Sequence, residues 1–296
     1  MKSFSEVLEA VKGRPAKKVV VAAAHDEPVL EAVKDARVQG IAEFILIGDC
    51  AKIKQLAAQL EMSLEGCELI EEANDRKAAY LAVSMVSSGK GDVLMKGLLS
   101  TADLLKAVLD KEVGLRTGRV LSHAYVFELP GMQRLLLVTD AAVNIAPQLK
   151  EKADIIQNSV GLAHALGIKP AKVAALAAVE VVNPNMPATL DAAALAKMGD
   201  RGQIKGAIID GPLAFDNAVN LEAARHKGIE SPVAGVADII MVPDIEAGNM
   251  MAKALTHYGG GRIAGLVLGA AKPIVLTSRA DTHDTKLMSI AFSTLM

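Results

Sequence analysis

The sequence predicts an α/β fold with mostly parallel sheets, because short apolar runs alternate with helical segments along the whole chain. Most of these runs are apolar throughout, which is typical of parallel strands covered on both faces. The chain has 296 residues, of which 51% are hydrophobic, so it can bury a large core. At roughly 150 residues per domain, this length indicates about two domains. The breaker dipeptide Pro130–Gly131 lies between two apolar runs and marks the expected boundary.

The predicted strands are short runs rich in Val, Ile and Leu, and most are followed by turn residues or by a helix start. In chain order they are Lys18–Ala24, Glu43–Gly48, Asp92–Met95, Arg134–Thr139, Lys172–Val179, Ile204–Asp210, Asp238–Val242 and Pro273–Thr277.

The predicted helices fill the intervals between these strands. In one of them Ala102, Leu105, Val108 and Leu109 repeat at the helical period. In chain order the helices are Pro28–Gln39, Ala51–Leu60, Asn74–Ser88, Thr101–Lys111, Pro147–Leu166, Asn217–His226, Glu246–His257 and Thr282–Leu295.

Composition excludes several classes of protein. The 32 Lys and Arg nearly balance the 34 Asp and Glu, so a net charge of −2 gives no reason to expect nucleic acid or a membrane as partner. Aromatic residues make up 3%, which argues against a stacking platform for nucleic acid. No stretch reaches the ~18 apolar residues of a membrane span, and the first residues lack the apolar core of a signal peptide. Cys50 and Cys67 cannot form a disulfide framework, which suits a reducing cytosol.

Common catalytic and cofactor motifs are absent from the sequence. The first predicted strand continues as VVVAAAHDEPVL, without a GxGxxG nicotinamide fingerprint, and there is no GxxxxGK[ST], HExxH, CxxC or GxSxG. The six His show no metal-ligand spacing, so no metal is expected. Neither cysteine has a visible base nearby, so a covalent thiol mechanism is not expected.

Ligands of open α/β sheets bind at the carboxyl ends of strands, so the residues after each strand are candidates. After the strand that ends at Met95 come Lys96 and Gly97, and then Ser100 or Thr101, either of which can cap a helix. Free N–H groups at a helix start, a hydroxyl and a nearby lysine form an anion site. The alternative is an ordinary turn followed by a capped helix.

Two later segments have the same ambiguity. Asp210 ends a predicted strand, and Asp216, near the next helix start, is either functional or a simple N-cap. Gly248 and Asn249 interrupt a helical pattern in which neither is favoured. Such a glycine marks the close approach of a ligand or, as the alternative, of another backbone.

The last predicted strand delivers Ser278 and Arg279 to its carboxyl end, and Asp281 and Asp284 follow. Arginine is a fork-shaped donor suited to phosphate. The alternative is that Asp281 or Thr282 caps the next helix and that Arg279 pairs with a carboxylate.

Together these segments resemble the phosphate acetyl/butyryl transferase family, and the resemblance covers nearly the whole chain. The motifs that carry it are MKGLLSTADLLKAV, VLSHAYVFELP, TDAAVNIAP, VEVVNPNMPATLDAA, DGPLAFDNAV, VAGVADIIMVPDIEAGNM and PIVLTSRADTHDTKLMSIA. The chain length and the forms MKGLL, NIAP and SRAD are more similar to the butyryl branch than to the acetyl branch.

This resemblance implies a fold like that of isocitrate and isopropylmalate dehydrogenases, with two α/β domains flanking a cleft. Residues 1–130 and 273–296 would form domain one, and residues 131–272 domain two. The family further implies a cytoplasmic homodimer or larger homo-oligomer that converts acyl-CoA and inorganic phosphate, reversibly, to acyl phosphate and CoA by direct attack in a ternary complex. Coenzyme A is then a substrate, and no permanently bound cofactor is expected.

The resemblance also suggests residue roles. Ser278 and Arg279 are expected to be catalytic, Arg279 by binding the phosphoryl group. The base of the acetyl branch aligns with Thr285, so Asp281 and Asp284 are the available bases; three apart on a helix, they would share a face. Asp281 is favoured because it lies nearer Arg279.

The expected substrate-binding residues come from two parts of the chain. They are Lys96, Gly97, Ser100 and Thr101 for inorganic or acyl phosphate, Lys106 for a CoA phosphate, and Asn249 for the facing side of the cleft. Three alternatives remain: a phosphate acetyltransferase acting on acetyl-CoA, a non-catalytic CoA-binding relative, and a decarboxylating dehydrogenase, which only the shared fold suggests.

Overall fold

The computed structural model describes residues 1–278 and 281–296. The chain divides into two compact units. We call Phe4–Arg119 with Ala264–Met296 the terminal unit, and Val120–Ile263 with Met1–Ser3 the central unit. The domain boundaries expected from the sequence, at residues 130 and 273, stay a prediction.

The terminal unit is built on strands in the order β3-β2-β1-β4-β11-β10. Their bounds are β1 Lys17–Ala22, β2 Ala42–Gly48, β3 Glu68–Glu71, β4 Val93–Lys96, β10 Arg262–Leu268, which begins in the central unit, and β11 Ile274–Val275. All neighbours pair in parallel except β10 and β11. The register aligns Ile45, Val20, Leu94 and Ile274 in one buried row, which explains why these runs are apolar.

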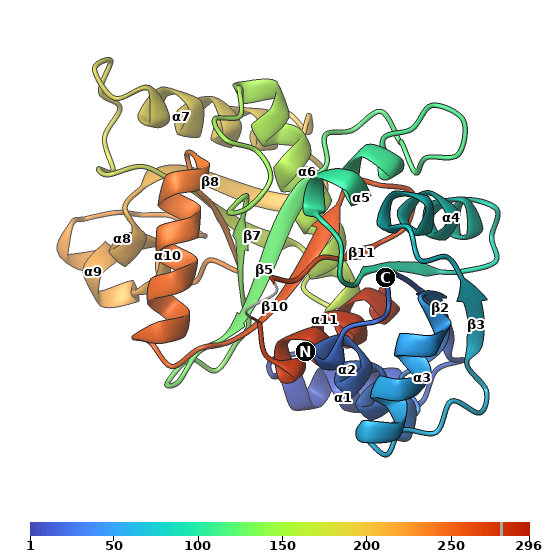
Figure 1. Ribbon diagram of the computed structural model, residues 1–296. Helices are drawn as coiled ribbons and strands as arrows, with labels where there is room; N and C mark the ends of the chain where they lie inside the picture. The colour runs from blue at the N-terminus through green and yellow to red at the C-terminus, as the bar shows by residue number, and fades with distance from the viewer. Residues whose placement is uncertain (279–280) are drawn as a thin grey trace. The chain divides into compact units, whose positions relative to one another are not determined.

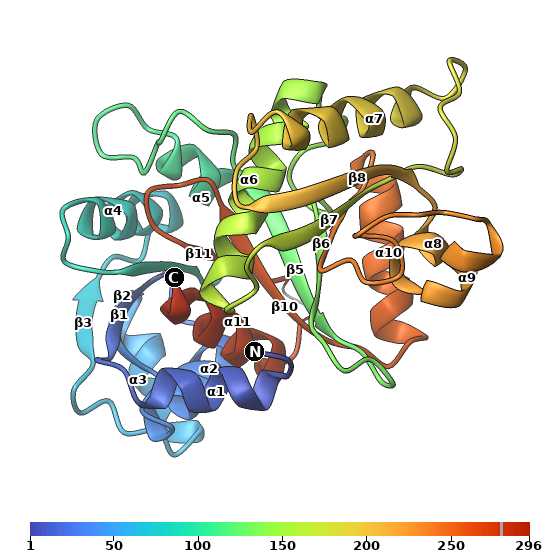
Figure 2. The same cartoon turned by 180° about the vertical axis from the view of Figure 1, so that it is seen from behind.

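Helices cover both faces of these strands. They are α1 Phe4–Lys12, α2 Glu27–Val38, α3 Cys50–Gln59, α4 Asp75–Ser87, α5 Thr101–Val108 and α11 His283–Leu295. In both views α4 and α5 lie on one side of the strands, and α1, α2 and α11 lie on the other (Figures 1 and 2). The last helix is tied to the first by the rings of Phe4 and Phe292, whose centroids are 5.2 Å apart, edge to face. The C-terminal segment therefore completes the core of this unit.

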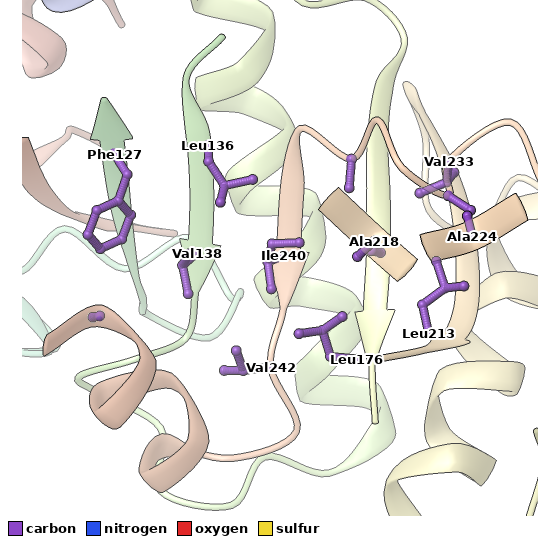
Figure 3. Packing of buried hydrophobic residues seen from close by; sticks show 14 residues of the cluster. Phe127, Leu136, Val138, Leu176, Leu213, Ala218, Ala224, Val233, Ile240 and Val242 are labelled. Carbon is purple, nitrogen blue, oxygen red and sulfur yellow. The ribbon is translucent and has the colours of Figure 1, made fainter. Parts of the chain in front are cut away.

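The central unit has strands in the order β5-β6-β9-β7-β8. Their bounds are β5 Ser122–Glu128, β6 Leu136–Thr139, β7 Ala171–Leu176, β8 Ala207–Leu213 and β9 Ile239–Met241; the helices are α6 Leu149–Ala165, α7 Pro187–Asp200, α8 Phe215–Val219, α9 Leu221–His226 and α10 Ile245–His257. Val138, Ile240 and Ala174 align across the sheet. They form one face of a cluster that α8, α9 and α10 cover, and Figure 3 shows its packing.

The predicted α/β fold is confirmed, with local corrections. Strands β3, β5 and β10 and helices α1 and α7 were not expected. The pair β5–β6 is antiparallel. The single helix expected over 217–226 is wrong, because the Asn220 side chain accepts hydrogen bonds from the Glu222 and Ala223 amides and starts a second helix there. Among the described residues, no helix is both long enough and apolar enough to cross a membrane.

Candidate active site

The carboxyl ends of β1, β4 and β11 meet at one edge of the terminal unit. Strand β4 pairs in parallel with β1 on one side and with β11 on the other. The amide of Gly97 donates to the Ala22 carbonyl and that of Leu98 to the Ala23 carbonyl, both at 2.8 Å. The loop after β4 is therefore fixed against the end of β1. The pairing of Val275 with Met95 brings the chain that leads to Ser278 to the same edge.

Lys96 and Gly97 shape the loop after β4. Lys96 is 6% exposed, and its Nζ donates to the carbonyls of Gly97 and Leu99 at 3.1 Å each. A Cβ on Gly97 would lie 2.1 Å from the Ala23 carbonyl oxygen and 2.6 Å from that of Ala22. Only glycine fits this close approach, and the lysine cation lies under the backbone of the loop.

Ser100 is the N-cap of α5. Its Oγ accepts a hydrogen bond from the Asp103 amide at 3.0 Å and lies 2.8 Å from Asp103 Oδ2. The hydrogen bond from the Ser100 hydroxyl to the Asp103 carboxylate is the main cause that lowers the pKa of Asp103, and the charge of Arg76 lowers it further. The capped-helix alternative is confirmed for Ser100. Thr101 begins the helix and is exposed, and Asp103 lies in the same first turn.

Lys106 lies one turn further along α5 and is exposed. It lines a surface hollow of about 170 Å³ together with Arg76 and Tyr80 from α4. The carboxylates of Asp103 and Asp110 line the same hollow, and Arg76 pairs with Asp103 at 3.0 Å. The hollow thus offers two cations and an aromatic ring. Sequence analysis missed Arg76 and Tyr80, because their helix is not adjacent to the motif in the sequence.

Ser278 and Asp281 form a closed turn after β11. The Ser278 amide donates to Asp281 Oδ2 at 2.6 Å, and the Asp281 amide donates to the Ser278 carbonyl at 3.2 Å. The side chain of Asp281 thereby holds the backbone of Ser278. Arg279 lies outside the described residues.

The expectation that Asp281 and Asp284 share a helix face is wrong. Helix α11 begins at His283, and Thr282 is its N-cap, since Thr282 Oγ1 accepts a hydrogen bond from the Thr285 amide at 3.3 Å. Asp281 precedes the cap, so it shares no helix face with Asp284. The hydroxyl of Thr285 is buried and lies 3.2 Å from that of Thr282. Thr285, at the position of the acetyl-branch base, therefore completes the helix cap.

Lys286 was missed by sequence analysis. It is 3% exposed, and its Nζ lies 2.6 Å from the Asp281 carbonyl oxygen and 3.3 Å from that of Ser278. Burial lowers the pKa of Lys286, and the nearby carboxylates of Asp281 and Asp26 oppose that shift. The signal in the sequence was a lysine at the start of the apolar part of the last helix, inside the motif PIVLTSRADTHDTKLMSIA.

Asn249 belongs to the central unit, on α10. Its side-chain amide donates to the Ala141 carbonyl at 3.2 Å. A Cβ on the preceding Gly248 would lie 2.9 Å from the Asp140 carbonyl oxygen and 2.8 Å from a methyl of Val242. The packing alternative for Gly248 is thus confirmed, and the role of Asn249 toward a ligand stays a prediction.

Asp216 is not an N-cap, because that position is Ala214.

A larger hollow, of about 620 Å³, lies at the opposite edge of the terminal unit, beside Ala16 and Ala42 where β1 and β2 begin. Its cations are already engaged, since Lys34 donates to the Leu60 carbonyl and Arg37 donates to two backbone carbonyls. Substrates of α/β sheets bind at the carboxyl edge, so size alone does not make this hollow the site. Within 1–278 and 281–296, no cluster of three His, Cys, Asp or Glu is arranged to hold a metal.

This architecture places the chain among α/β proteins with a dehydrogenase-like fold. A solved structure described as a 4-hydroxythreonine-4-phosphate dehydrogenase, from Salmonella typhimurium, aligns with a TM-score of 0.57 over 95% of this chain and 99% of that chain. The sequence identity is 14%, so this likeness concerns the fold alone.

Closer similarities define the family. The phosphate acetyl/butaryl transferase model matches residues 3–79 and 70–294. A phosphate butyryltransferase of Clostridium acetobutylicum is 54% identical over 100% of this chain and 98% of its own. The structure of a branched-chain phosphotransacylase from Enterococcus faecalis V583 aligns with a TM-score of 0.84 and 32% identity, over 94% of this chain and 98% of that chain. The chain belongs to the phosphate acetyl/butaryl transferase family, as its motifs predicted.

Proposed function

We propose that this protein is a phosphate acyltransferase that converts a short-chain acyl-CoA, butyryl-CoA first, and inorganic phosphate to an acyl phosphate and CoA, reversibly. The observation that carries the proposal is the 54% identity with a phosphate butyryltransferase along the whole chain. The geometry agrees, because the polar turn of Ser278 and Asp281 and the loop of Lys96 lie at one carboxyl edge of the sheet.

In the proposed reaction a phosphate oxygen attacks the thioester carbon, and the tetrahedral oxyanion collapses as the carbon–sulfur bond breaks. Arg279 binds the phosphoryl group, and the Ser278 hydroxyl donates to the carbonyl oxygen or to the sulfur. Asp281 takes the proton of the attacking hydrogen phosphate and gives it to the departing CoA sulfur; in the reverse direction it takes the thiol proton as general base and returns it to the phosphate. No group on the protein becomes acylated.

The substrates are assigned to neighbouring features of the terminal unit. Inorganic or acyl phosphate binds at the loop of Lys96, Gly97, Ser100 and Thr101, and a phosphate of CoA binds at Lys106 in the hollow between α4 and α5. Arg76 in that hollow supports this assignment with a second cation. Asn249, on α10, belongs to the same proposal as a substrate-binding residue. Coenzyme A is a substrate of this cytoplasmic homodimer or larger homo-oligomer, not a resident cofactor.

The proposal is tested by following free thiol release from butyryl-CoA with and without inorganic phosphate, beside acetyl-CoA. We expect release that depends on phosphate and is faster with butyryl-CoA. Faster release from acetyl-CoA would identify a phosphate acetyltransferase, and release without phosphate would identify a thioesterase.

A non-catalytic CoA-binding relative is the second candidate, because Thr285 stands where the acetyl branch has its base and is used to cap a helix. Binding of acyl-CoA by calorimetry, with no release of thiol from any acyl-CoA, would favour it.

A further inference from the structure

A buried cation donates hydrogen bonds to the turn that carries Ser278. Lys286 extends from α11 to the backbone carbonyls of Ser278 and Asp281, at 3.3 Å and 2.6 Å. The same two residues are also joined by the hydrogen bond from the Ser278 amide to Asp281 Oδ2 and by the one from the Asp281 amide to the Ser278 carbonyl. The ammonium group thus connects the two ends of the turn.

A lysine is an unfavourable choice for this position unless its charge is used. The side chain is 3% exposed, and its neighbours Leu287 and Met288 on α11 are apolar and buried. Burying an ammonium group costs free energy unless hydrogen bonds and nearby opposite charge compensate. Both compensations are present, since the two carbonyls accept its protons and the carboxylates of Asp281 and Asp26 lie near enough to favour its charged form.

The contact of Lys286 with the turn fixes the turn to helix α11. Lys286 donates to carbonyl oxygens and is linked to Asp281 at both the carbonyl and, by charge, the carboxylate. Because α11 is packed into the core through Phe292, the lysine transmits the rigid position of the helix to the turn. A side chain without donors would remove one hydrogen bond from each of the two carbonyls and, with them, one attachment of the turn.

We propose that Lys286 is a positioning residue for acyl transfer, which fixes Ser278 and Asp281 by holding their backbone carbonyls and does not itself contact the substrate. The inference rests on the proposed function of the same turn and adds a residue to which the sequence analysis assigned no role.

The test compares Lys286→Met with Lys286→Arg in the full-length protein. Methionine keeps the apolar stem but has no donor, whereas arginine restores a cation with donors. We expect kcat for thiol release from butyryl-CoA to fall about 100-fold in Lys286→Met, because a small misplacement of reacting groups has an effect of that size. The KM for butyryl-CoA is expected to stay within about threefold of wild type, since Lys286 does not contact the substrate. Lys286→Arg is expected to recover most of the lost kcat. Lys77→Met, on the exposed face of α4, is the matched control and is expected to leave kcat unchanged.

A second readout does not depend on turnover. Amide hydrogen exchange at Ser278 and Asp281 is expected to be at least about tenfold faster in Lys286→Met than in wild type, because the turn loses one attachment. Exchange in the core of α4 is expected to stay the same. If Lys286→Met does not fold, Lys286→Gln takes its place. Glutamine keeps an amide donor on a shorter side chain without charge, so we expect changes in the same direction, a fall in kcat of at least about fivefold and faster exchange at Ser278 and Asp281.

The outcomes separate this inference from the proposed function. A wild-type protein that releases no thiol would overturn the proposed function before any variant is measured, and an unchanged exchange rate at Ser278 and Asp281 would still overturn the positioning contact by itself. An active wild type with an unchanged kcat in Lys286→Met would overturn the inference alone. A loss that appears only as a higher KM would also overturn it, since that result assigns Lys286 to substrate binding.

Discussion

The two carboxylates that follow Ser278 have different surroundings at the scale of single residues. Asp281 lies in the turn and accepts the Ser278 amide hydrogen, whereas Asp284 lies in the first turn of α11. Asparagine at position 281 keeps an oxygen that accepts the Ser278 amide hydrogen, but it cannot exchange a proton with a thiol. The substitution therefore removes the acid–base function and leaves the turn closed.

We expect Asp281→Asn to lower kcat by about 10²–10⁴-fold, the usual contribution of a general acid or base, and Asp284→Asn to lower it less than about tenfold. The measurement is thiol release from butyryl-CoA at saturating phosphate for both variants. Equal losses, or a larger loss in Asp284→Asn, would discard Asp281 as the base.

Asp238 permits a prediction about stability and pH. Burial raises the pKa of Asp238, although the Lys172 amide, which donates to its Oδ2 at 2.9 Å, and the charge of Arg134 oppose the shift. Because the folded pKa lies above the unfolded value, the folded state binds this proton more readily, and the ionised carboxylate destabilises the fold at pH values above the raised pKa. That penalty disappears as the pH falls through the raised pKa toward the unfolded value of about 3.9.

Asp238→Asn is neutral at every pH and keeps an oxygen that accepts the Lys172 amide hydrogen. We therefore expect its Tm at pH 7 to exceed that of wild type by up to about 2 °C, a small effect because the side chain is only half-buried. The difference is expected to vanish near pH 4 in melts followed by circular dichroism. A lower Tm for the variant at pH 7 would contradict the sign of this linkage.

At the scale of elements, the loop between β4 and α5 depends on close packing against β1. The Cβ of an alanine at position 97 would overlap the carbonyl oxygens of Ala22 and Ala23, which are backbone atoms within and just after β1. These atoms cannot rotate away as a side chain can, so the loop that contains Lys96 would have to move.

We expect Gly97→Ala to destabilise the protein by about 1–3 kcal/mol, in the range of overpacked cores, and to lower phosphate-dependent turnover as well. Gly13→Ala is the matched control, because a Cβ there has no neighbour within 4 Å and the backbone has an ordinary φ. Urea unfolding of both variants measures the difference. A Gly97→Ala protein as stable and as active as the control would contradict this prediction, because it would show that a Cβ fits at position 97.

Sequence patterns predicted some elements better than others for physical reasons. Strands such as β1 and β4 are buried on both faces, so their apolar runs were visible. Strand β3, ELIE, is a short edge strand with charged ends, and β5, SHAYVFE, mixes polar and apolar residues. Neither resembles a buried parallel strand, and their pairing depends on partners far along the chain.

The candidate site shows the same division between local and tertiary signals. Ser100 and Thr282 were each predicted as one of two alternative caps, because an N-cap is a local pattern. Because Thr282 is the cap, Asp281 lies outside α11. The contact of Lys286 with the turn was not predictable, because it depends on how α11 packs beside β11.

At the scale of the whole molecule, the type of reaction depends on whether the chain itself accepts the acyl group. Its two cysteines are Cys50 and Cys67. Burial raises the pKa of the Cys50 thiol, and Glu71 raises it further; burial also raises the pKa of Cys67, with Arg37 opposing. Both side chains are therefore thiols at neutral pH, and a thiol is a poor nucleophile compared with a thiolate.

The proposed direct attack of phosphate on the thioester needs no thiolate on the protein, and it has a kinetic signature. We expect the double variant Cys50→Ser/Cys67→Ser to retain kcat within about twofold, because a cysteine that takes no part in the chemistry contributes nothing to transition-state stabilisation. Initial rates at several phosphate and butyryl-CoA concentrations are expected to give intersecting lines, since a ternary complex forms before any bond breaks. Labelled CoA is expected to exchange into butyryl-CoA only when phosphate is present. Parallel lines, with exchange in the absence of phosphate, would instead identify an acylated enzyme, because that pattern requires the acyl group to remain on the protein after CoA leaves.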